Sequence, residues 1–357
     1  MSSAQQDKPI HGRGAGHNPT NRFERLAILP DADAQLPECE QIQPRTQFFR
    51  DSSKSVIAYN SSPDVGFTTS LNPYRGCEHG CIYCYARPTH EYLGFSAGLD
   101  FETRIMVKED APDLLRAEMS KKSWVPQTVV IGGVTDPYQP AERKLRLTRR
   151  CLEVFLEFKN PATVITKNHL VTRDVDVLSA MAKENLTGVF VSITTLRKEL
   201  TQIMEPRTAV PKMRLAVIEK MAKAGVPVGV MVAPVIPGLT DEEMPAILKA
   251  AGDAGAITAG YVPVRLPFAV KELFEKWLQE HMPDRKEKVL NRIREIRGGK
   301  LNDSDFHTRM RGFGVFAEQL KNMFEIASRK AGIPFRHLEL STAGFRVPGG
   351  QMALFGG

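Results

Sequence analysis

The sequence is poor in cysteine and has no second cysteine pair that could complete a structural zinc site. It contains five cysteines, an odd number, and three of them lie within residues 77–84. This clustering excludes a disulfide framework and predicts a reducing compartment, the cytoplasm. The sequence also lacks an apolar run long enough to span a membrane, and residues 1–26 lack the apolar stretch of a signal peptide. We therefore expect a cytoplasmic protein with no membrane partner.

The rest of the composition is ordinary for a soluble globular protein, with 42% hydrophobic and 25% charged residues. A chain of 357 residues can form one large α/β domain with appendages. The formal net charge is 48 − 41 = +7. This basic excess is compatible with a nucleic-acid partner but does not establish one.

Four regions differ in character along the chain. Residues 1–54 are rich in Gly, Pro, Asn and Gln and predict an extended or disordered arm. Residues 55–267 alternate short apolar runs with amphipathic segments and form the predicted core. Residues 268–345 predict a mostly helical extension, with nine Lys or Arg against four Asp or Glu between positions 285 and 311. Residues 346–357 predict a flexible tail.

The alternation in the core predicts parallel strands covered on both faces by helices. The expected strands are 67–71, 128–131, 162–166, 188–193, 226–235 and 257–264, and the expected helices are 109–121, 141–158, 173–184, 211–224 and 241–253. The run Thr240–Glu243 has the form of a capping box at the start of the last helix. Six β-α units favour a partial TIM-like (β/α)6 barrel, although a doubly wound sheet gives the same alternation.

The motif CEHGCIYC, with Cys77, Cys81 and Cys84 in a C-x3-C-x2-C spacing, follows the first predicted strand directly. Thiolates favour zinc and iron–sulfur clusters. A structural zinc ion takes four ligands and is fully closed. Three thiolates on a four-iron cluster leave one iron open to a ligand that is not protein. The spacing therefore favours a reactive cluster, and a zinc knuckle is the alternative.

Polar or loop-shaping residues follow the next four predicted strands, where a parallel barrel gathers its functional residues. They are Gly132-Gly133-Val134-Thr135-Asp136, then Lys167, then Ser192 to Thr195, then the loop that starts at Ala233. The run Glu205-Pro206-Arg207 was a further candidate, as an ion pair closing the barrel mouth. Each signal is weak by itself, but their order along the chain predicts one shared site.

The stretches NPYRGCEHGCIYCYARPTHEYLG, TDPYQPAE, ITKN, RDVDVL, SITT, EPR, APVIPGL and VRLP, in this order, resemble the "DNA repair photolyase" branch of the radical S-adenosylmethionine (SAM) superfamily. That branch is related to spore photoproduct lyase. The resemblance runs from about Ser55 to Phe316, and a fainter piece, RGAGHNPTNRFE, lies in the N-terminal arm. It implies a [4Fe–4S] cluster on Cys77, Cys81 and Cys84. It also implies SAM contacts from Tyr83, Tyr85, Thr135, Asp136, Lys167, Ser192 and Ala233.

The resemblance further implies an enzyme that reduces SAM to a 5′-deoxyadenosyl radical and abstracts hydrogen from a substrate, with nucleic acid favoured. An electron donor such as flavodoxin or ferredoxin is then required. Two alternatives are a peptide or small-molecule substrate, and a non-catalytic iron–sulfur module. The sequence departs from the spore lyase at Gly133, where that enzyme has a cysteine that returns a hydrogen atom to the product. The resemblance does not extend to that step.

The tail contains Gln351-Met352-Ala353-Leu354-Phe355, which resembles the bacterial sliding-clamp-binding motif Q-x-x-L-F. In that motif the Gln hydrogen-bonds and the Leu-Phe pair fills an apolar pocket. The alternative is a terminal segment that docks Leu354 and Phe355 on its own core. For the basic stretch 285–311, a solvated face and a phosphate-binding surface remain equally open.

Overall fold

The main sheet of the protein, seen in a computed structural model that describes residues 10, 12–24, 44–334 and 338–349, has seven strands. Their order is β10-β9-β8-β7-β6-β3-β2. The parallel strands are β3 (Thr69–Leu71), β6 (Val129–Ile131), β7 (Ala162–Thr166), β8 (Thr187–Ser192), β9 (Val228–Val235) and β10 (Thr258–Pro263). At the edge, β2 (Ile57–Tyr59) pairs antiparallel with β3.

The strand order decides between the two folds that fit the alternation. A doubly wound sheet reverses its order at a switch point. Here each parallel strand lies beside the one that precedes it in the chain, as in a barrel. Within the described residues, β10 pairs only with β9, so the sheet stays open. The predicted α/β fold with a parallel, partial barrel is confirmed.

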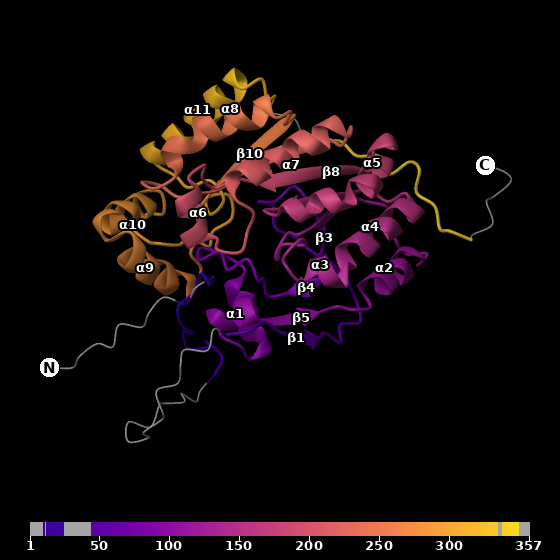
Figure 1. Cartoon of the computed structure of the whole chain (residues 1–357), viewed down its shortest axis with the longest axis horizontal. Coiled ribbons are helices and arrows are strands. Elements are labelled where there is room, and N and C mark those ends of the chain that lie inside the picture. The colour runs from indigo at the N-terminus through magenta and orange to yellow at the C-terminus, as the bar shows by residue number, and fades with distance from the viewer. Residues whose placement is uncertain (1–9, 11, 25–43, 335–337, 350–357) are drawn as a thin grey trace.

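Helices cover the outer side of the sheet (Figure 1). They are α2 (Ala111–Met119), α4 (Leu147–Phe158), α5 (Val175–Lys183), α7 (Pro211–Lys223) and α8 (Met244–Asp253), with α11 (Val315–Lys330) packed beside α8. In α4, the buried side chains of Cys151, Val154, Phe155 and Phe158 recur at helical spacing and form the stripe that faces the sheet. Together with the apolar strands they form one continuous core.

A second, three-stranded sheet lies below the first in Figure 1, in the order β1-β5-β4. Its strands are β1 (Gln47–Arg50), β4 (Tyr74–Arg75) and β5 (Arg104–Val107). The remaining helices are α1 (Leu99–Thr103), α3 (Glu142–Leu145), α6 (Lys198–Met204), α9 (Val270–His281) and α10 (Lys286–Glu295), with short 3-10 turns at Arg87–Leu93, His169–Asp174, Asp241–Glu243 and Pro283–Arg285. Strand β1 belongs to the segment expected to be an arm, so part of that arm is paired with the core.

The capping box predicted at Thr240–Glu243 is wrong. The helix begins only at Met244, and Glu243 uses its carboxylate elsewhere. It accepts hydrogen bonds from Thr195 Oγ1 and Leu196 N, both at 2.7 Å. Thr240 Oγ1 accepts from Ile236 N at 2.9 Å instead of capping the helix. Glu243 lies before the first helical turn, and its carboxylate is taken up by Thr195 and Leu196. It is therefore not available for a capping box.

Side chains bridge the open side of the barrel, between β10 and the β2–β3 edge. Arg297 donates to Val264 O, just after β10, and to Arg309 O. Arg309 in turn bonds Ser62 Oγ and the buried Asp64 carboxylate, in the loop between β2 and β3. The segment after α10 thus links both edges of the sheet.

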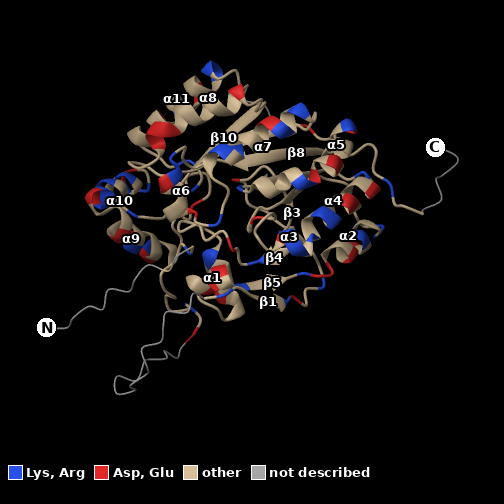
Figure 2. Ribbon diagram, viewed as in Figure 1, with Lys and Arg blue, Asp and Glu red and all other residues tan. Residues whose placement is uncertain are grey.

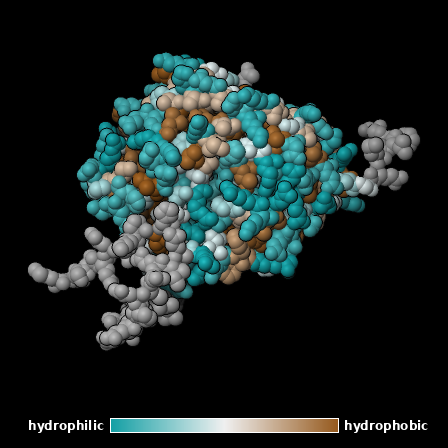
Figure 3. All heavy atoms as spheres, viewed as in Figure 1, coloured by the Kyte–Doolittle hydropathy of each residue, from teal (hydrophilic) through white to brown (hydrophobic). Residues whose placement is uncertain are grey.

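The outer helices carry both signs of charge, and Figure 2 shows Lys and Arg interspersed with Asp and Glu. The face shown in Figure 3 is mostly hydrophilic, with separate small apolar patches. Among the described residues, no helix is long and apolar enough to cross a bilayer. Of the aromatic residues in the basic extension, Phe306 and Phe313 are about half exposed.

Candidate active site

The cysteine loop lies between β3 and α1, at the carboxyl end of the parallel strands. Cys77 and Cys81 are buried, Cys84 is partly exposed, and all are free thiols. Cys77 N donates to Phe101 O at 2.9 Å, and Cys84 N donates to Cys81 O at 3.2 Å. Gly80, between the first two cysteines, has φ +66°, a conformation that glycine adopts without steric cost. The loop is thus held at its backbone while its thiols remain available.

The thiols fit a cluster better than a single ion. Among the described residues, no three His, Cys, Asp or Glu side chains form a group that could hold one metal ion. A structural zinc ion needs four ligands converging on one point, at about 2.0 to 2.3 Å each. A four-iron cluster instead spreads its thiolates over separate irons. Three Cys thiols have the donor chemistry that an iron–sulfur cluster takes, because such clusters are held by Cys thiolates.

Buried charges of both signs lie near the thiols. Burial and then the negative charge of Glu205 raise the pKa of the Cys81 thiol, and the positive charges of Lys167 and Arg214 oppose that rise. Burial likewise raises the pKa of Cys84, opposed by Arg87 and Lys167. Thiolates bound to a cluster carry negative charge, and cations at this position stabilise that state.

Glu205 is the centre of a buried network beside the loop. Its carboxylate accepts from Thr194 Oγ1 at 2.7 Å and also contacts Tyr83 Oη and an Arg214 NH2 group. Lys167 Nζ lies 3.4 Å from the carboxylate and donates to Ala233 O at 2.9 Å. Burial, and then the charge of Arg214, lower the pKa of Lys167 to about 8.

The run Glu205-Pro206-Arg207 was expected to contain an ion pair that closes the barrel mouth. The structure shows no pair between its own two charges, because they point to different partners. Glu205 pairs with Arg214 and Lys167. Arg207 NH1 lies 3.0 Å from Glu78 Oε1, in the cysteine loop. The run therefore ties a barrel loop to the cysteine loop.

Asp136 joins the second strand end to the cysteine loop. Its Oδ2 lies 3.3 Å from His79 Nδ1 and accepts from Lys167 N at 2.7 Å, while Oδ1 accepts from Thr166 Oγ1 at 2.7 Å. Burial by itself raises the pKa of Asp136, but His79 and the hydrogen bonds outweigh it and hold the pKa below its ordinary value. Both carboxylate oxygens are thus already occupied by partners within the protein.

The seven residues expected to contact SAM are distributed over two adjoining groups. Tyr83, Lys167 and Ala233 meet around Glu205 and Thr194. Thr135 and Asp136 lie at the end of β6, where Thr135 Oγ1 donates to Tyr74 O at 2.8 Å.

The other two residues expected to contact SAM are Ser192 and Tyr85. Ser192 is buried, and its carbonyl accepts from Arg214. Tyr85 is half exposed and its hydroxyl reaches Gly133 O. The roles of all these residues toward SAM stay predictions.

Gly133 lies in open surroundings at the end of β6. A Cβ atom added there would be 3.5 Å from the nearest atom of the Phe67 ring and 3.8 Å from Ser70 Cβ. A side chain therefore fits at this position, so the missing cysteine is not excluded by packing. Of the other two cysteines, Cys151 is fully buried on α4, and Cys39 lies outside the described residues.

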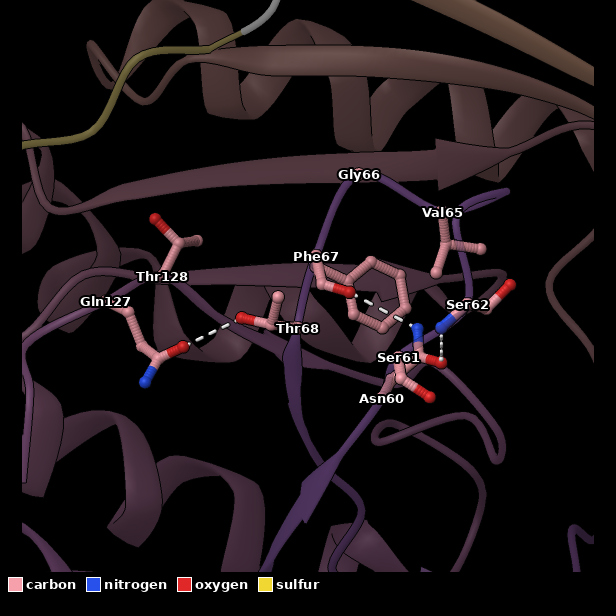
Figure 4. Close-up of a pocket in the computed structure, with 9 residues that line it drawn as sticks. All are labelled: Asn60, Ser61, Ser62, Val65, Gly66, Phe67, Thr68, Gln127 and Thr128. Atoms are coloured by element: carbon pink, nitrogen blue, oxygen red, sulfur yellow. Dashed lines mark hydrogen bonds between the residues drawn. The ribbon is translucent and has the colours of Figure 1, made fainter.

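A hollow of about 340 Å³ lies beside the β2–β3 loop, at the amino ends of β3 and β6 (Figure 4). Six of its nine lining residues have polar side chains, namely Asn60, Ser61, Ser62, Thr68, Gln127 and Thr128, and the others are Val65, Gly66 and Phe67. Thr68 Oγ1 donates to Gln127 Oε1 across it at 2.8 Å. The cysteine loop is at the other end of the strands, and functional residues of parallel barrels gather there. We therefore do not assign this hollow to the chemistry.

The sequence patterns missed several buried residues that hold the site together. Arg87 and Glu102 are fully buried beneath the cysteine loop, 2.5 Å apart. His79 is buried between Asp136 and Asn168. Residues 13–21 of the N-terminal arm lie against the loop. For residues 13–21, the family-like piece RGAGHNPTNRFE in the arm is the sequence signal that includes them.

An open parallel barrel with a three-cysteine loop at its carboxyl edge defines a class of cofactor-dependent barrel proteins. The sequence model of the radical SAM superfamily matches residues 71–251. The chain therefore belongs to the radical SAM superfamily. An uncharacterized protein of Mycobacterium tuberculosis is 36% identical over 67% of this chain and 71% of its own length. An uncharacterized protein of Methanocaldococcus jannaschii is 25% identical over 67% of this chain and 86% of its own.

Among solved structures, spore photoproduct lyase complexed with dinucleoside spore photoproduct is similar in fold. It aligns with a TM-score of 0.58 over 79% of each chain, at 16% sequence identity. A mutant of that lyase with bound AdoMet and the same dinucleoside aligns with a TM-score of 0.57 over 76% of each chain. At this identity the likeness establishes the fold, and the reaction of this chain has to be argued from its own residues.

Proposed function

We propose that the protein is a radical SAM enzyme that holds a [4Fe–4S] cluster on Cys77, Cys81 and Cys84 and binds SAM above it. The observation that carries the proposal is the loop of three free thiols at the carboxyl edge of a parallel barrel, with the cations Lys167, Arg214 and Arg87 near Cys81 and Cys84. When bound, such a cluster supplies the single electron that cleaves SAM to a 5′-deoxyadenosyl radical. An external donor such as flavodoxin or ferredoxin replenishes that electron.

The chain's own residues then bind and orient the cofactor. Lys167, a buried cation at the end of β7, is suited to the carboxylate of SAM. The centroid of the Tyr83 ring lies 5.8 Å from Lys167 Nζ. Tyr83 belongs to the same buried apolar cluster as Cys81. Thr135, Ser192 and Ala233 line neighbouring strand ends, and Asp136 positions the loop through His79. Tyr85, half exposed beside Gly133, is assigned to pack near SAM.

Anaerobic reconstitution with iron, sulfide, dithionite and SAM tests this proposal. The wild-type protein is expected to bind four irons, as a [4Fe–4S] cluster requires, and to release 5′-deoxyadenosine. Cys77→Ala, Cys81→Ala and Cys84→Ala should each lose the cluster. Cys151→Ala is the matched control, because it removes a buried free thiol on α4, away from the loop. Equal iron content in all five proteins, without 5′-deoxyadenosine, contradicts the proposal.

We further propose nucleic acid as the substrate class, and Arg265 supports it. This residue follows β10, and its guanidinium lies 5.5 Å from the centroid of the Tyr85 ring. Its NH1 donates to Met310 Sδ, its Nε is buried without a hydrogen-bond partner, and within the described residues it forms no ion pair. Asp64 and Asp303 act on this partly buried guanidinium only from beyond ion-pair distance. A phosphodiester would match its fork geometry and supply a direct partner. The dinucleoside bound by spore photoproduct lyase is in keeping with this class.

Binding of an oligonucleotide measured over a salt series tests the substrate class. Log Kd should depend linearly on log salt, and Arg265→Ala should weaken binding and lower that slope by about 1. Arg116→Ala is the control, because Arg116 is exposed on the outer helix α2, away from the basic stretch, and is already paired with Glu157. Binding that is insensitive to salt and to Arg265 contradicts nucleic acid and leaves a peptide or small molecule as substrate. Nucleic-acid binding without SAM cleavage by the reconstituted protein points instead to a non-catalytic module.

The proposed sliding-clamp contact through Gln351, Leu354 and Phe355 lies outside the described residues. The chain just before it runs beside α5 and α4 (Figure 1), where Ser341 N donates to Asn185 O and Arg346 N donates to Phe158 O. This is the amino end of the strands, away from the cysteine loop. A clamp bound there would leave the barrel mouth free. Deletion of residues 351–355 should abolish clamp binding and leave SAM cleavage unchanged.

A further inference from the structure

Residues 13–21, here named the strap, lie against Gly80 of the cysteine loop and against residues 91–102, although at least 56 positions of sequence separate the strap from the loop. Gly14 N and Ala15 N donate to the Glu102 carboxylate at 3.0 and 2.8 Å. Arg13 donates to the carbonyl of the same residue at 2.8 Å. Ala15 is 1% exposed and packs in the buried apolar cluster that contains Cys81. The strap is therefore part of the core around the loop.

Glu102 connects the strap to the cysteine loop through Arg87. The carboxylate lies 2.5 Å from Arg87 NH2, and both side chains are fully buried. Arg87 Nε donates to Cys81 O at 3.0 Å, and Arg87 N donates to Cys84 O at 3.2 Å. One buried ion pair thus holds the strap on one side and, through the Arg87 side chain, the carbonyl of Cys81 on the other.

Two glycines allow the strap and the loop to touch backbone to backbone. A Cβ atom at Gly14 would lie 1.7 Å from Gly80 O, a distance no structure can accommodate. A Cβ atom at Gly80 would lie 2.7 Å from Glu102 Oε2 and 3.2 Å from Gly14 N. No side chain can be inserted between the two segments. Gly80 lies between Cys77 and Cys81, so the position of the strap fixes the backbone that carries both thiols.

The other end of the strap is fixed as tightly. A Cβ atom at Gly98 would lie 2.1 Å from His17 O. Ser96 Oγ donates to Pro19 O at 2.6 Å, and Asn21 Nδ2 donates to Glu91 O at 3.0 Å. Contacts over the whole length of the strap argue that it docks as a unit.

We infer that the strap is a positioning element of the cofactor site, acting on Cys77 and Cys81 through Glu102 and Gly80. This inference rests on the proposed cluster. With the strap in place, the loop presents its thiols in one fixed arrangement and is covered on the strap side. Without it, the buried Glu102 loses two backbone donors and Gly80 loses its packing partner. The cluster should then be held less firmly.

A pair of single-methyl substitutions tests the inference. Gly14→Ala should displace the strap, whereas Gly16→Ala is the control, because a Cβ atom there has nothing within 4 Å. After anaerobic reconstitution, Gly14→Ala should lose its cluster in air at least fivefold faster than the wild type. It should also broaden the electron paramagnetic resonance signal of the reduced cluster. Gly16→Ala should match the wild type in both measurements.

Two further variants keep the inference falsifiable if Gly14→Ala folds poorly. Deletion of residues 2–24 removes the strap without introducing a clash, and Gly98→Ala displaces it from the opposite side. Both should reproduce the cluster defect while circular dichroism keeps the helical signal of the folded barrel. If wild-type protein binds no cluster, the proposed function fails. If it does, and these variants hold the cluster with an unchanged signal, the strap inference alone is overturned.

Discussion

The buried network around Glu205 allows a quantitative prediction. The carboxylate is fully buried and faces two cations, Arg214 and Lys167. Removing one partner of a buried ion pair leaves uncompensated charge and costs about 3–5 kcal/mol. Glu205→Ala should therefore lower the free energy of unfolding by that amount. Glu205→Gln keeps the shape and some hydrogen bonds, and its cost should be smaller.

Glu219 on α7 provides the matched control. It pairs with Lys223 at i,i+4, and both side chains are more than half exposed. Exposed helix pairs contribute about 0.3–0.5 kcal/mol, so Glu219→Ala should hardly change stability. The comparison thus sets the loss of a buried carboxylate against the loss of an exposed one.

Urea denaturation of the metal-free proteins measures the difference. With a slope of about 3 kcal/mol per molar urea, the midpoint of Glu205→Ala should fall by roughly 1–1.7 M. Similar, small shifts for Glu205→Ala and Glu219→Ala would refute the reasoning, because they would mean that the buried cations find other partners. A large loss of stability in both variants would mean that α7 and the loop before it tolerate no substitution. The buried charge of Glu205 would then not be the cause.

Two further predictions follow from the site. The pKa of Lys167 is lowered to about 8 from 10.5, so between these values the unfolded chain binds the proton and the native protein does not. The stability of the wild type relative to Lys167→Met should therefore rise with pH across this window, by about 1.4 kcal/mol per pH unit. Urea denaturation at several pH values measures this difference, and a difference that does not change with pH would contradict the lowered pKa. Gly132 has φ +93°, and a Cβ atom there would lie 2.5 Å from Ile165 O. Gly132→Ala should lower the free energy of unfolding by about 1–3 kcal/mol, whereas Gly133→Ala should change it by no more than about 0.5 kcal/mol. Thermal unfolding compares the two variants, and equal shifts of their midpoints would contradict this prediction.

The main features of the fold were accessible from sequence because they depend on local pattern. The run Val228–Val235 is apolar throughout and forms one buried strand of the sheet, β9. The amphipathic run before Gly225 is a helix, α7, which ends at Lys223. The capping box at Thr240 failed, although it is also a local signal, because Glu243 found stronger partners in a distant loop.

The sequence by itself determined the order of the β-α units, the cysteine spacing and the strand ends that carry polar residues. Each of these is encoded within a few neighbouring positions. Only the tertiary structure decided that Asp136 pairs with His79, that Glu205 lies between Arg214 and Lys167, and that the strap docks on Gly80. The pairing with His79 and the docking of the strap join segments more than fifty residues apart. A buried charge has no periodicity, and its partner is selected by burial and geometry once the chain has folded.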